Sequence, residues 1–499
     1  MEKKAGYTRY LQRILAVLFW LLLWQIASMV LNKSFLLVSP LEAGKRFLEL
    51  VFTAGFWKAT GGTMLRIMCG FFLAVAAGIL LAAASASREW VRVFLAPLVT
   101  VIRTVPVVSF VILALILISS RYLCVLISFL MAFPVIYENV LKGILQCDPA
   151  LLEMAGVFGV SGKNRLLWIY IPGVFPYFRP AFSTALSFAW KSGIAAEVIG
   201  MPTGSVGERM QQAKIYLASA DLIAWTIAVV LCSQLLLFLG NRVMDFVQQG
   251  YGRKRHPVAG DKTAQGTGPQ GAAEGAAGEK EKATEARKEE TAESPQYGAA
   301  PRDILVDHID KSFGDRVVFR DYSCVFKGGE ISVLSQPSGF GKTTLFRLIL
   351  GLDAPDRGNI TGMEGRRPGV VFQEDRLLLS MDVYHNLRLV SSGVSAAAME
   401  EALEAVGLGD RLYTPVEELS GGMQRRVALL RALLADWDYL ILDEAFRGLD
   451  QETKRMVMDY VLRERKGRSI LMAAHEPEEA EYMQGEADFW NRTKRSPAG

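Results

Sequence analysis

A glycine-rich run at residues 336–344 has the residue types that bind phosphate. It reads Gln-Pro-Ser-Gly-Phe-Gly-Lys-Thr-Thr, follows a β-rich run and opens a helical stretch. In that setting, successive backbone N–H groups and the helix N-terminus hold phosphate oxygens. We expect Lys342 to reach the β- and γ-phosphates of a nucleotide and the Thr343 hydroxyl to bind Mg²⁺. The other residues of the run expected to contact the nucleotide are Ser338, Gly339, Gly341 and Thr344.

One position departs from the usual pattern of a phosphate-binding loop. Gln336 stands where the first glycine is usual. A side chain at that position can restrict the turn or crowd the nucleotide. Taken alone, the run could also be a glycine-rich turn before a helix, so its interpretation depends on the other motifs.

Polar residues that suit phosphate hydrolysis stand at the ends of three other predicted strands. An apolar run from residue 439 ends in two carboxylates, Asp443 and Glu444. Asp443 can hold Mg²⁺, directly or through water, and Glu444 is placed to polarise the attacking water. Gln373 could contact Mg²⁺ or that water, and His475 could hydrogen-bond the γ-phosphate.

A second glycine motif, Leu-Ser-Gly-Gly-Met-Gln at 419–424, precedes a long helix. Its glycines let the backbone approach a phosphate at the helix N-terminus. With these motifs in this order, residues 303–480 resemble the ATP-binding-cassette (ABC) ATPases. In that family the motif completes the ATP site of the partner subunit, so the site forms only in a dimer. The residues that the resemblance assigns to this contact are Ser420, Gly421, Gly422 and Gln424.

The resemblance also assigns roles to four other residues. Gln373 matches the glutamine of the Q-loop, and His475 matches the switch histidine. Asp450 ends the stretch that matches the loop crossing the dimer. Phe313 stands where the family places an aromatic residue that stacks on adenine; the alternative is an ordinary half-buried aromatic.

Further departures from the family concern the catalytic rate more than nucleotide binding. The residues after the Q-loop read Leu-Leu-Leu-Ser at 377–380, where a proline is common. After Ala480 the chain ends quickly, where the family usually continues with further strands. Lys342, Asp443 and Glu444 are nevertheless all in place, so we expect ATP binding.

These motifs need an α/β domain of the P-loop NTPase type to position them. Short β-rich runs alternate with helical stretches from about residue 303, which predicts a largely parallel sheet. Residues 256–301 contain no Leu, Ile, Phe, Met or Trp, so they cannot offset chain ordering and should be disordered. The predicted boundaries are a linker at 252–302, the ATPase domain at 303–491 and a polar tail at 492–499.

The first 251 residues predict an all-α transmembrane domain with six helices, similar to type I ABC importers. The chain is 51% hydrophobic, and nearly all its long apolar runs lie in this half. Most reach the length of about 20 residues that a bilayer requires, and helices satisfy their own backbone hydrogen bonds there. The predicted spans are 14–31, 64–86, 93–119, 122–141, 180–199 and 222–246.

Charge and cysteine content exclude several other classes. A net charge of +4 does not favour a nucleic-acid partner, and the five scattered cysteines indicate neither a disulfide framework nor a metal site. Basic residues place both chain ends in the cytoplasm. Counting spans from a cytoplasmic N-terminus puts the basic stretch 32–66 outside the cell, against the rule that basic loops are cytoplasmic. We keep this orientation because the ATPase must meet cytoplasmic ATP. We therefore expect a multi-pass protein of the cytoplasmic membrane.

A loop between the fourth and fifth predicted spans contains Glu153-Met-Ala155, then Gly159 and Pro172. It resembles the Glu-Ala-Ala loop of bacterial importer permeases, with Met154 in place of alanine. The resemblance implies a short cytoplasmic helix that docks near the Q-loop and transmits closure of the ATPase to the membrane helices. The alternative is a solvated helix turn.

The wider stretch 37–245 resembles permeases of the nitrate, sulfonate and taurine type. Its residues Lys191 and Glu197 lie in or near the fifth predicted span, where charge is expensive and usually functional. Their spacing puts them on different faces of a helix, so no direct pair is expected. Lys191 could line the path of an anionic solute, or it could snorkel or pack against carbonyl groups at a helix end.

Together these features predict a fused permease and ATPase that imports a small anion as a homodimer with two bound ATP. The chain contains no solute-binding domain, so a separate extracellular binding protein is implied. An exporter is the first alternative, but exporters lack the loop at Glu153. The second is a nucleotide-binding regulator or scaffold with decayed hydrolysis, motivated by Gln336 and the short C-terminus.

Overall fold

The computed structural model describes residues 2–31, 37–252, 302–336, 339–391, 393–474 and 476–483. The chain forms two compact units. The first contains residues 1–147 and 170–251, and the second contains residues 148–169 and 252–499. The segment 148–169 therefore packs with the second unit, although its sequence neighbours belong to the first. Nearly all of the predicted linker, and the predicted polar tail, lie outside the described residues.

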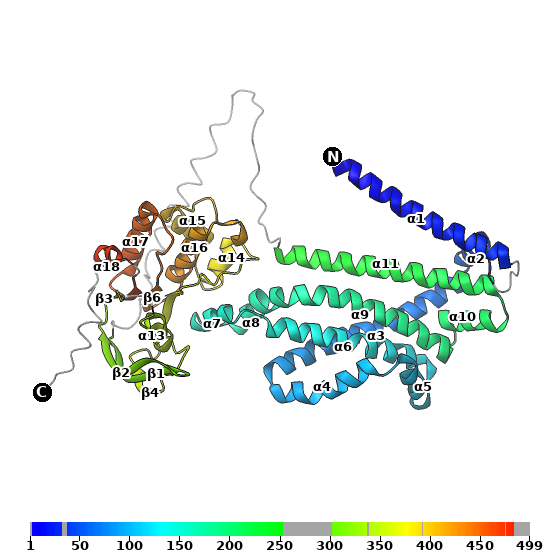
Figure 1. The fold of residues 1–499 in the computed structure, drawn as a ribbon, viewed down its shortest axis with the longest axis horizontal. Helices are drawn as coiled ribbons and strands as arrows, with labels where there is room; N and C mark the ends of the chain where they lie inside the picture. Colours follow the sequence, from blue (N-terminus) through cyan, green and yellow to red (C-terminus); the bar gives the residue numbers. More distant parts are fainter. Residues whose placement is uncertain are drawn as a thin grey trace, which may run out of the picture. The chain divides into compact units, whose positions relative to one another are not determined.

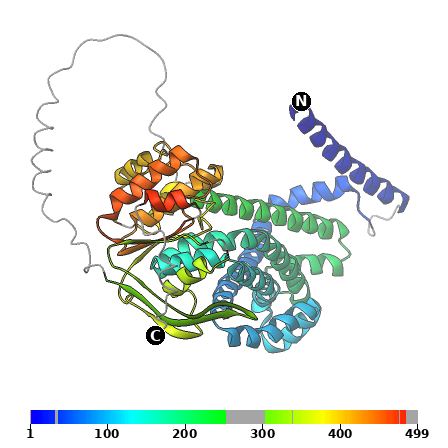
Figure 2. The same ribbon diagram turned by 60° about the vertical axis from the view of Figure 1, so that its left-hand side comes forward.

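The first unit is entirely helical. Three of its long helices, α3, α6 and α9, lie side by side (Figures 1 and 2). The helices of this unit are α1 (Glu2–Leu31), α2 (Pro40–Val51), α3 (Ala54–Ser87), α4 (Glu89–Thr104), α5 (Val107–Leu117), α6 (Ser120–Leu145), α9 (Ile171–Gly200), α10 (Val206–Ile215) and α11 (Ser219–Gly252).

Among the described residues, three helices are long and apolar enough to cross a membrane, or up to four if a bent pair counts as one span. The three are α3, α6 and residues 219–248 of α11. Helix α1 contains a shorter apolar stretch, and α9 is not among them. Fewer helices than the six predicted therefore qualify by length and composition, although the predicted spans 14–31 and 180–199 fall on α1 and α9.

The prediction of one continuous span at 93–119 is wrong. Helices α4 and α5 are bent by 105° relative to each other. Val105 between them is extended, with φ −76° and ψ 130°. Pro106 follows Val105, and the residue before a proline is driven out of the helical region by a clash with the proline ring. The apolar composition continues through this point, but the backbone cannot continue through it as one straight helix.

Small residues allow the helices of the first unit to approach closely. A Cβ atom at Gly70 of α3 would lie 2.3 Å from the carbonyl oxygen of Val125 in α6. A Cβ atom at Gly193 of α9 would lie 2.5 Å from the Ser128 hydroxyl, also in α6. Such contacts between backbones are what drives helix association where lipid removes the hydrophobic driving force.

A buried ion pair ties α9 to α3. Glu197 is 0% exposed, and its Oε1 accepts a hydrogen bond from Arg66 Nε at 2.9 Å and lies 2.8 Å from Arg66 Nη2 in the ion pair. Its Oε2 accepts from the Thr63 hydroxyl at 2.7 Å and from the backbone N–H of Gly207, in the first turn of α10. Glu197 does not pair with Lys191, as expected, because its partner is Arg66.

The second unit confirms the predicted α/β domain. Its parallel sheet has the order β3-β7-β6-β5, and a separate antiparallel sheet has the order β2-β1-β4. The strands are β1 (Ile304–Phe313), β2 (Arg316–Phe326), β3 (Ile331–Leu334), β4 (Arg357–Thr361), β5 (Pro368–Val371), β6 (Tyr439–Asp443) and β7 (Ser469–Ala473). The helices are α7 (Pro149–Val157), α8 (Gly162–Arg165), α13 (Lys342–Ile349), α14 (Val383–Arg388), α15 (Ala396–Ala405), α16 (Gly421–Leu434), α17 (Gln451–Arg465) and α18 (Pro477–Tyr482), with helical turns at Leu166–Tyr170 and Val416–Glu418.

Side-chain alternation divides the core between the two faces of the parallel sheet. Leu440 and Leu442 of β6 pack in one cluster with α16 and α17, whereas Ile441 packs in a second cluster with α13 and the antiparallel sheet. This follows from the pleat, which points successive side chains to opposite faces. All five residues of β6 are buried, as expected for a parallel strand covered on both sides (Figure 1). Its last residue, Asp443, therefore lies at the carboxyl end of a rigid sheet.

Candidate functional site

The glycine-rich run forms a tight loop between β3 and α13. Gly339 and Gly341 have φ values of +89° and +92°, which residues with a Cβ rarely adopt. A Cβ atom at Gly341 would also lie 2.7 Å from Val318 Cγ1 and 2.9 Å from the Phe319 ring. The loop can therefore bring its backbone N–H groups to the start of α13 only with glycine at this position. Ser338 lies outside the described residues.

Lys342 begins α13 and lies across the ends of two neighbouring strands. It is 8% exposed, and its Nζ donates to the carbonyl oxygens of Gln336 at 2.6 Å and Ala474 at 3.2 Å. Gln336 and Ala474 follow β3 and β7, which pair in parallel. The ammonium group is thus held where the loop closes, although Gln336 replaces the usual glycine. Thr344, the third residue of α13, is half-buried.

Three residues predicted to bind Mg²⁺ line one cavity of about 180 Å³: Thr343, Gln373 and Asp443. Asp443 is 5% exposed, and its Oδ1 has no hydrogen-bond partner among the described residues. Burial raises the pKa of the Asp443 carboxyl above its ordinary value, opposed by a hydrogen bond with the Thr343 side chain. A buried carboxylate oxygen with no partner is costly, so this oxygen is a ready ligand for a cation.

Glu444 follows β6 in a strained conformation. Its φ is +49°, and the residue is 9% exposed. Its N–H donates to the carbonyl oxygen of Ala473 at 3.2 Å, and its Oε2 accepts from Arg447 at 3.2 Å. Non-glycine residues at positive φ persist only when the surrounding structure holds them there. His475, the other predicted catalytic side chain on this edge, lies outside the described residues.

Arg425 is a residue of this site that the sequence did not single out. It lies in α16, is 5% exposed, and donates to the carbonyl oxygens of Asp443 and Glu444 at 3.0 and 2.7 Å. It also donates to the carbonyl oxygens of Phe372, Gln373 and Ala445 and to the Asp375 carboxylate. One guanidinium therefore joins the strand end that carries the two carboxylates to the segment that carries Gln373. Sequence alone did not distinguish it from Arg426, which is adjacent.

The residues of the motif at 419–424 do not line the cavity that contains Thr343, Gln373 and Asp443. Ser420 caps α16 by accepting from the Met423 N–H, and Gly421 and Gly422 begin the helix. Gln424 donates to the carbonyl oxygens of Val416 and Leu419, so its amide holds its own turn. Within one chain, this motif therefore lies outside the candidate metal cavity.

Two other predicted contacts have plain local roles in the structure. Asp450 caps α17 by accepting from the Thr453 N–H at 3.0 Å, and this bond lowers the pKa of Asp450. Phe313 ends β1 and is 51% exposed, with the Lys311 ammonium 5.2 Å from the ring centroid. The stacking of this half-exposed ring on adenine stays a prediction.

The segment 148–169 packs into the second unit through α7. Met154 and Ala155 are both 0% exposed and belong to the same core cluster as α13. Gly159 follows the helix at φ +62°, where a side chain would be strained. Pro172 lies in the first turn of α9 and belongs to the first unit. The alternative of a solvated helix turn is therefore wrong for α7, and the departure to methionine fills the core.

Glu153 fixes α7 through two arginines. Its carboxylate accepts two hydrogen bonds from Arg347 of α13, both at 3.0 Å, and one from Arg376 at 3.0 Å. The hydrogen bonds with Arg347 lower the pKa of Glu153 below its ordinary value. Arg347 and Arg376 also line the cavity that contains Thr343 and Asp443. The docked helix thus contacts residues that form one wall of the candidate metal cavity.

Comparison with known proteins gives two family matches along the chain. Residues 74–253 match the binding-protein-dependent transport system inner membrane component family. Residues 319–447 match the ABC transporter family.

Individual relatives resemble part of the chain. An aliphatic sulfonates import ATP-binding protein of Rhodococcus jostii is 38% identical over 188 residues, which cover 36% of this chain and 68% of that protein. A protein of the same name from Paracoccus denitrificans is 36% identical over 180 residues, covering 36% of this chain and 74% of that protein. A Nod factor export ATP-binding protein of Rhizobium johnstonii is 35% identical over 209 residues, covering 38% of this chain and 67% of that protein.

Proposed function

This chain belongs to the ABC transporter family, with a permease and an ATPase in one chain, and we propose that it imports a small anion across the cytoplasmic membrane. It is an integral membrane protein that binds ATP and couples ATP hydrolysis to transport. The observation that best supports import is the contact of Glu153 with Arg347 and Arg376. The buried side chains of α7 show that this helix packs into the ATPase unit, as the loop of importer permeases requires.

The residues of the second unit suit the chemistry of ATP hydrolysis. The N–H groups at the start of α13 and the Lys342 ammonium would hold the phosphates. Asp443, Thr343 and Gln373 would hold Mg²⁺, and the free Oδ1 of Asp443 fits a hard cation. The ion would neutralise charge on the phosphate oxygens. Glu444 would accept a proton from the attacking water, and Asp443 beside it would stay bound to the metal.

We propose that two copies of this chain sandwich two ATP molecules. The position of the motif at 419–424 outside the cavity that contains Thr343 and Asp443 supports this, because a neighbouring copy could bring its own motif to that cavity. Ser420, Gly421 and Gly422 present a helix N-terminus, which suits a phosphate. Phe313 would stack on adenine, and Asp450 would lie at the dimer interface. ATP binding would close the pair, and α7 would carry the movement to the membrane helices.

The ATPase half does not decide the direction of transport by itself, since its relatives include both import and export proteins. The membrane half favours import, because residues 74–253 match the inner membrane component of binding-protein-dependent systems. An extracellular solute-binding protein is therefore proposed as a partner. The sulfonate importers among the relatives favour an aliphatic sulfonate or a similar anion as the solute.

The test is affinity purification of the tagged, solubilised chain from its native membranes, followed by mass spectrometry of proteins and released small molecules. Import predicts recovery of an extracellular binding protein that carries an anion. Recovery of other transporter complexes without such a partner would contradict import. Loss of ATP turnover in Glu444→Gln, with turnover in the parent protein, would exclude a regulator whose hydrolysis has decayed.

A further inference from the structure

Helix α9 carries three charged residues, and two of them are paired. Glu197 is buried against Arg66, and Arg179 pairs with Asp245 of α11. The third, Lys191, is exposed and makes no hydrogen bond or ion pair with any residue that the structure describes. Its neighbours Trp190 and Ser192 are both buried. Lys191 therefore lies on the outward face of a packed helix in the predicted fifth span.

Lys191 cannot bring its charge to the end of the helix. It lies nine residues before Gly200, the last residue of α9, and that distance is about 13 Å at 1.5 Å per residue. The extended lysine side chain reaches only about half as far, and the other end of α9 is more distant. A lysine facing lipid near the middle of a span costs about 2.5–3.5 kcal/mol on insertion scales. The outward face of α9 must therefore meet water or polar groups.

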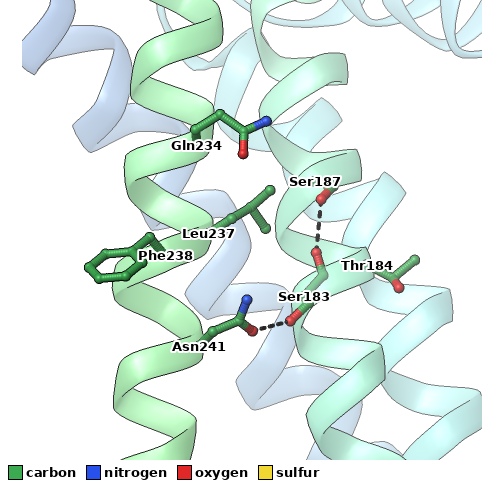
Figure 3. A pocket seen from close by; sticks show the side chains of 7 residues that line it. All are labelled: Ser183, Thr184, Ser187, Gln234, Leu237, Phe238 and Asn241. Carbon is green, nitrogen blue, oxygen red and sulfur yellow. Dashed lines mark hydrogen bonds between the residues drawn. The ribbon is translucent and has the colours of Figure 1, made fainter. Parts of the chain in front are cut away.

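Other polar side chains lie on the same side of α9. Thr184 precedes Lys191 by seven residues and Ser187 precedes it by four, which places them within about 20° and 40° of Lys191 around the helix. Both line an open groove of about 480 Å³ between α9 and α11 (Figure 3). Its polar lining consists of Ser183, Thr184, Ser187, Gln234 and Asn241.

The groove contains hydrogen-bonding groups and no charged residue. The Ser183 hydroxyl donates to the Asn241 side-chain oxygen at 2.6 Å, and the Ser187 hydroxyl donates to the Ser183 carbonyl oxygen at 2.9 Å (Figure 3). Gln234 faces Ser187 across the groove. Hydroxyl and amide groups suit a polar solute, and one unpaired ammonium group beside them sets the sign of its charge.

We propose that Lys191, Ser187 and Thr184 form an anion-binding subsite on the path of the solute through the membrane domain. Lys191 supplies the positive charge that balances the anion. The Ser187 and Thr184 hydroxyl groups, which donate to the carbonyl oxygens of Ser183 and Pro180 in this structure, would turn to donate hydrogen bonds to its oxygens. A sulfonate, with three oxygens and one negative charge, fits this donor set. The position of this subsite on a solute path rests on the proposed transport function. The subsite adds to that function a residue, Lys191, that selects the charge of the solute.

The test uses a thiol introduced next to Lys191 as a probe of local charge. Ser187→Cys is made in a chain whose Cys69 and Cys232 are serine, because the other three cysteines are buried. The protein in proteoliposomes is treated with 2-sulfonatoethyl or 2-(trimethylammonium)ethyl methanethiosulfonate. The first reagent is itself an alkyl sulfonate, and both cross membranes poorly. The measured quantity is the ratio of the anionic to the cationic modification rate.

We expect this ratio to fall at least tenfold when Lys191→Met is added, and to be retained with Lys191→Arg. Phe72→Cys, on an exposed apolar part of α3, is the matched control and should react with neither reagent. If Ser187→Cys does not fold, Thr184→Cys serves in its place. Equal ratios with and without Lys191, or no reaction at position 187 under conditions in which ATP is hydrolysed, would overturn the subsite.

This result is separate from that of the import test. An exporter with the same subsite would show charge-selective modification and no association with an extracellular binding protein. An importer without the subsite would associate with the binding protein, and its modification would not depend on Lys191.

Discussion

Removal of the Glu153 carboxylate is expected to separate ATP hydrolysis from transport. The carboxylate accepts three hydrogen bonds from two guanidinium groups, and its side chain is 32% exposed. Breaking a fully buried pair costs about 3–5 kcal/mol and a surface pair at most about 1 kcal/mol. At this exposure we expect Glu153→Ala to weaken docking of α7 by about 2–4 kcal/mol. That is roughly a 30- to 900-fold shift toward the undocked helix.

Two measurements would detect this shift toward the undocked helix. Hydrogen–deuterium exchange of residues 149–157 should accelerate at least tenfold in Glu153→Ala, whereas the amides of β6 should be unaffected. In proteoliposomes, ATP turnover should persist while solute moved per ATP falls. Glu464→Ala is a matched control, because its side chain is 28% exposed and pairs with Lys466 far from α7 in sequence. Unchanged exchange in α7, together with unchanged transport per ATP, would refute the docking role of Glu153.

The pH dependence of this contact has a defined sign. The hydrogen bonds with Arg347 depress the pKa of Glu153 below its ordinary value of 4.5. A carboxyl whose pKa is depressed by a contact stabilises that contact above the ordinary pKa and loses the stabilisation as pH falls through the lowered pKa. Docking should therefore be constant between pH 6 and pH 8 and weaken only at acidic pH below 4.5. Protection of the α7 amides, that is, exchange corrected for its intrinsic pH dependence, that varied between pH 6 and pH 8 in the parent but not in Glu153→Ala would contradict this.

Three further substitutions test the ATP site. Gly341→Ala combines a φ of +92° with contacts of 2.7 and 2.9 Å to β2, so it should weaken ATP binding at least tenfold in a fluorescent-nucleotide titration. The control Gly351→Ala, at φ +67° with nothing within 4 Å of its new Cβ atom, should not weaken binding. Equal losses in the two variants would refute the crowding argument. Glu444→Gln should lower phosphate release at least a hundredfold and leave ATP affinity within about threefold, and substantial turnover in this variant would mean that another group activates water. Arg425→Met leaves several carbonyl groups without their hydrogen-bond donor, so we expect the free energy of unfolding to fall by about 3 kcal/mol or more. An unchanged midpoint of thermal unfolding would show that these hydrogen bonds do not stabilise the protein.

Local motifs predicted the site where chemistry is encoded in adjacent residues. The run at 336–344 predicted a tight loop before a helix because glycine spacing and a following helical stretch are local signals. The end of an apolar strand predicted the positions of Asp443 and Glu444 for the same reason. Arg425 was not predicted, because its six acceptors come from segments 18 to 53 residues away and only the fold brings them together.

The membrane half was harder to predict because hydropathy does not report backbone geometry. Composition alone marked 93–119 as one span, although Pro106 within it already limits the helix and a bend of 105° results. Charge spacing excluded a pair between Lys191 and Glu197, but it could not identify Arg66 as the partner, since that contact joins two helices 131 residues apart. Spacing along one helix tells which residues share a face, and packing decides what that face meets.

The arginines of the second unit connect α7 to the edge of the sheet that carries Asp443 and Glu444. Arg425 holds Gln373 and Asp375 to the end of β6, and Arg431, 1% exposed, donates to the carbonyl oxygens of Asp375 and Arg376. Arg376 in turn holds Glu153 of α7. Burial lowers the pKa of Arg431 to about 10, which still leaves it charged at neutral pH. Because each contact fixes the backbone of the next residue in this series, a shift of Gln373 toward bound nucleotide would have to move Arg376 as well. Rigid contacts of this kind transmit a displacement, so we propose the segment after Gln373 as the place where ATP binding is coupled to the membrane domain.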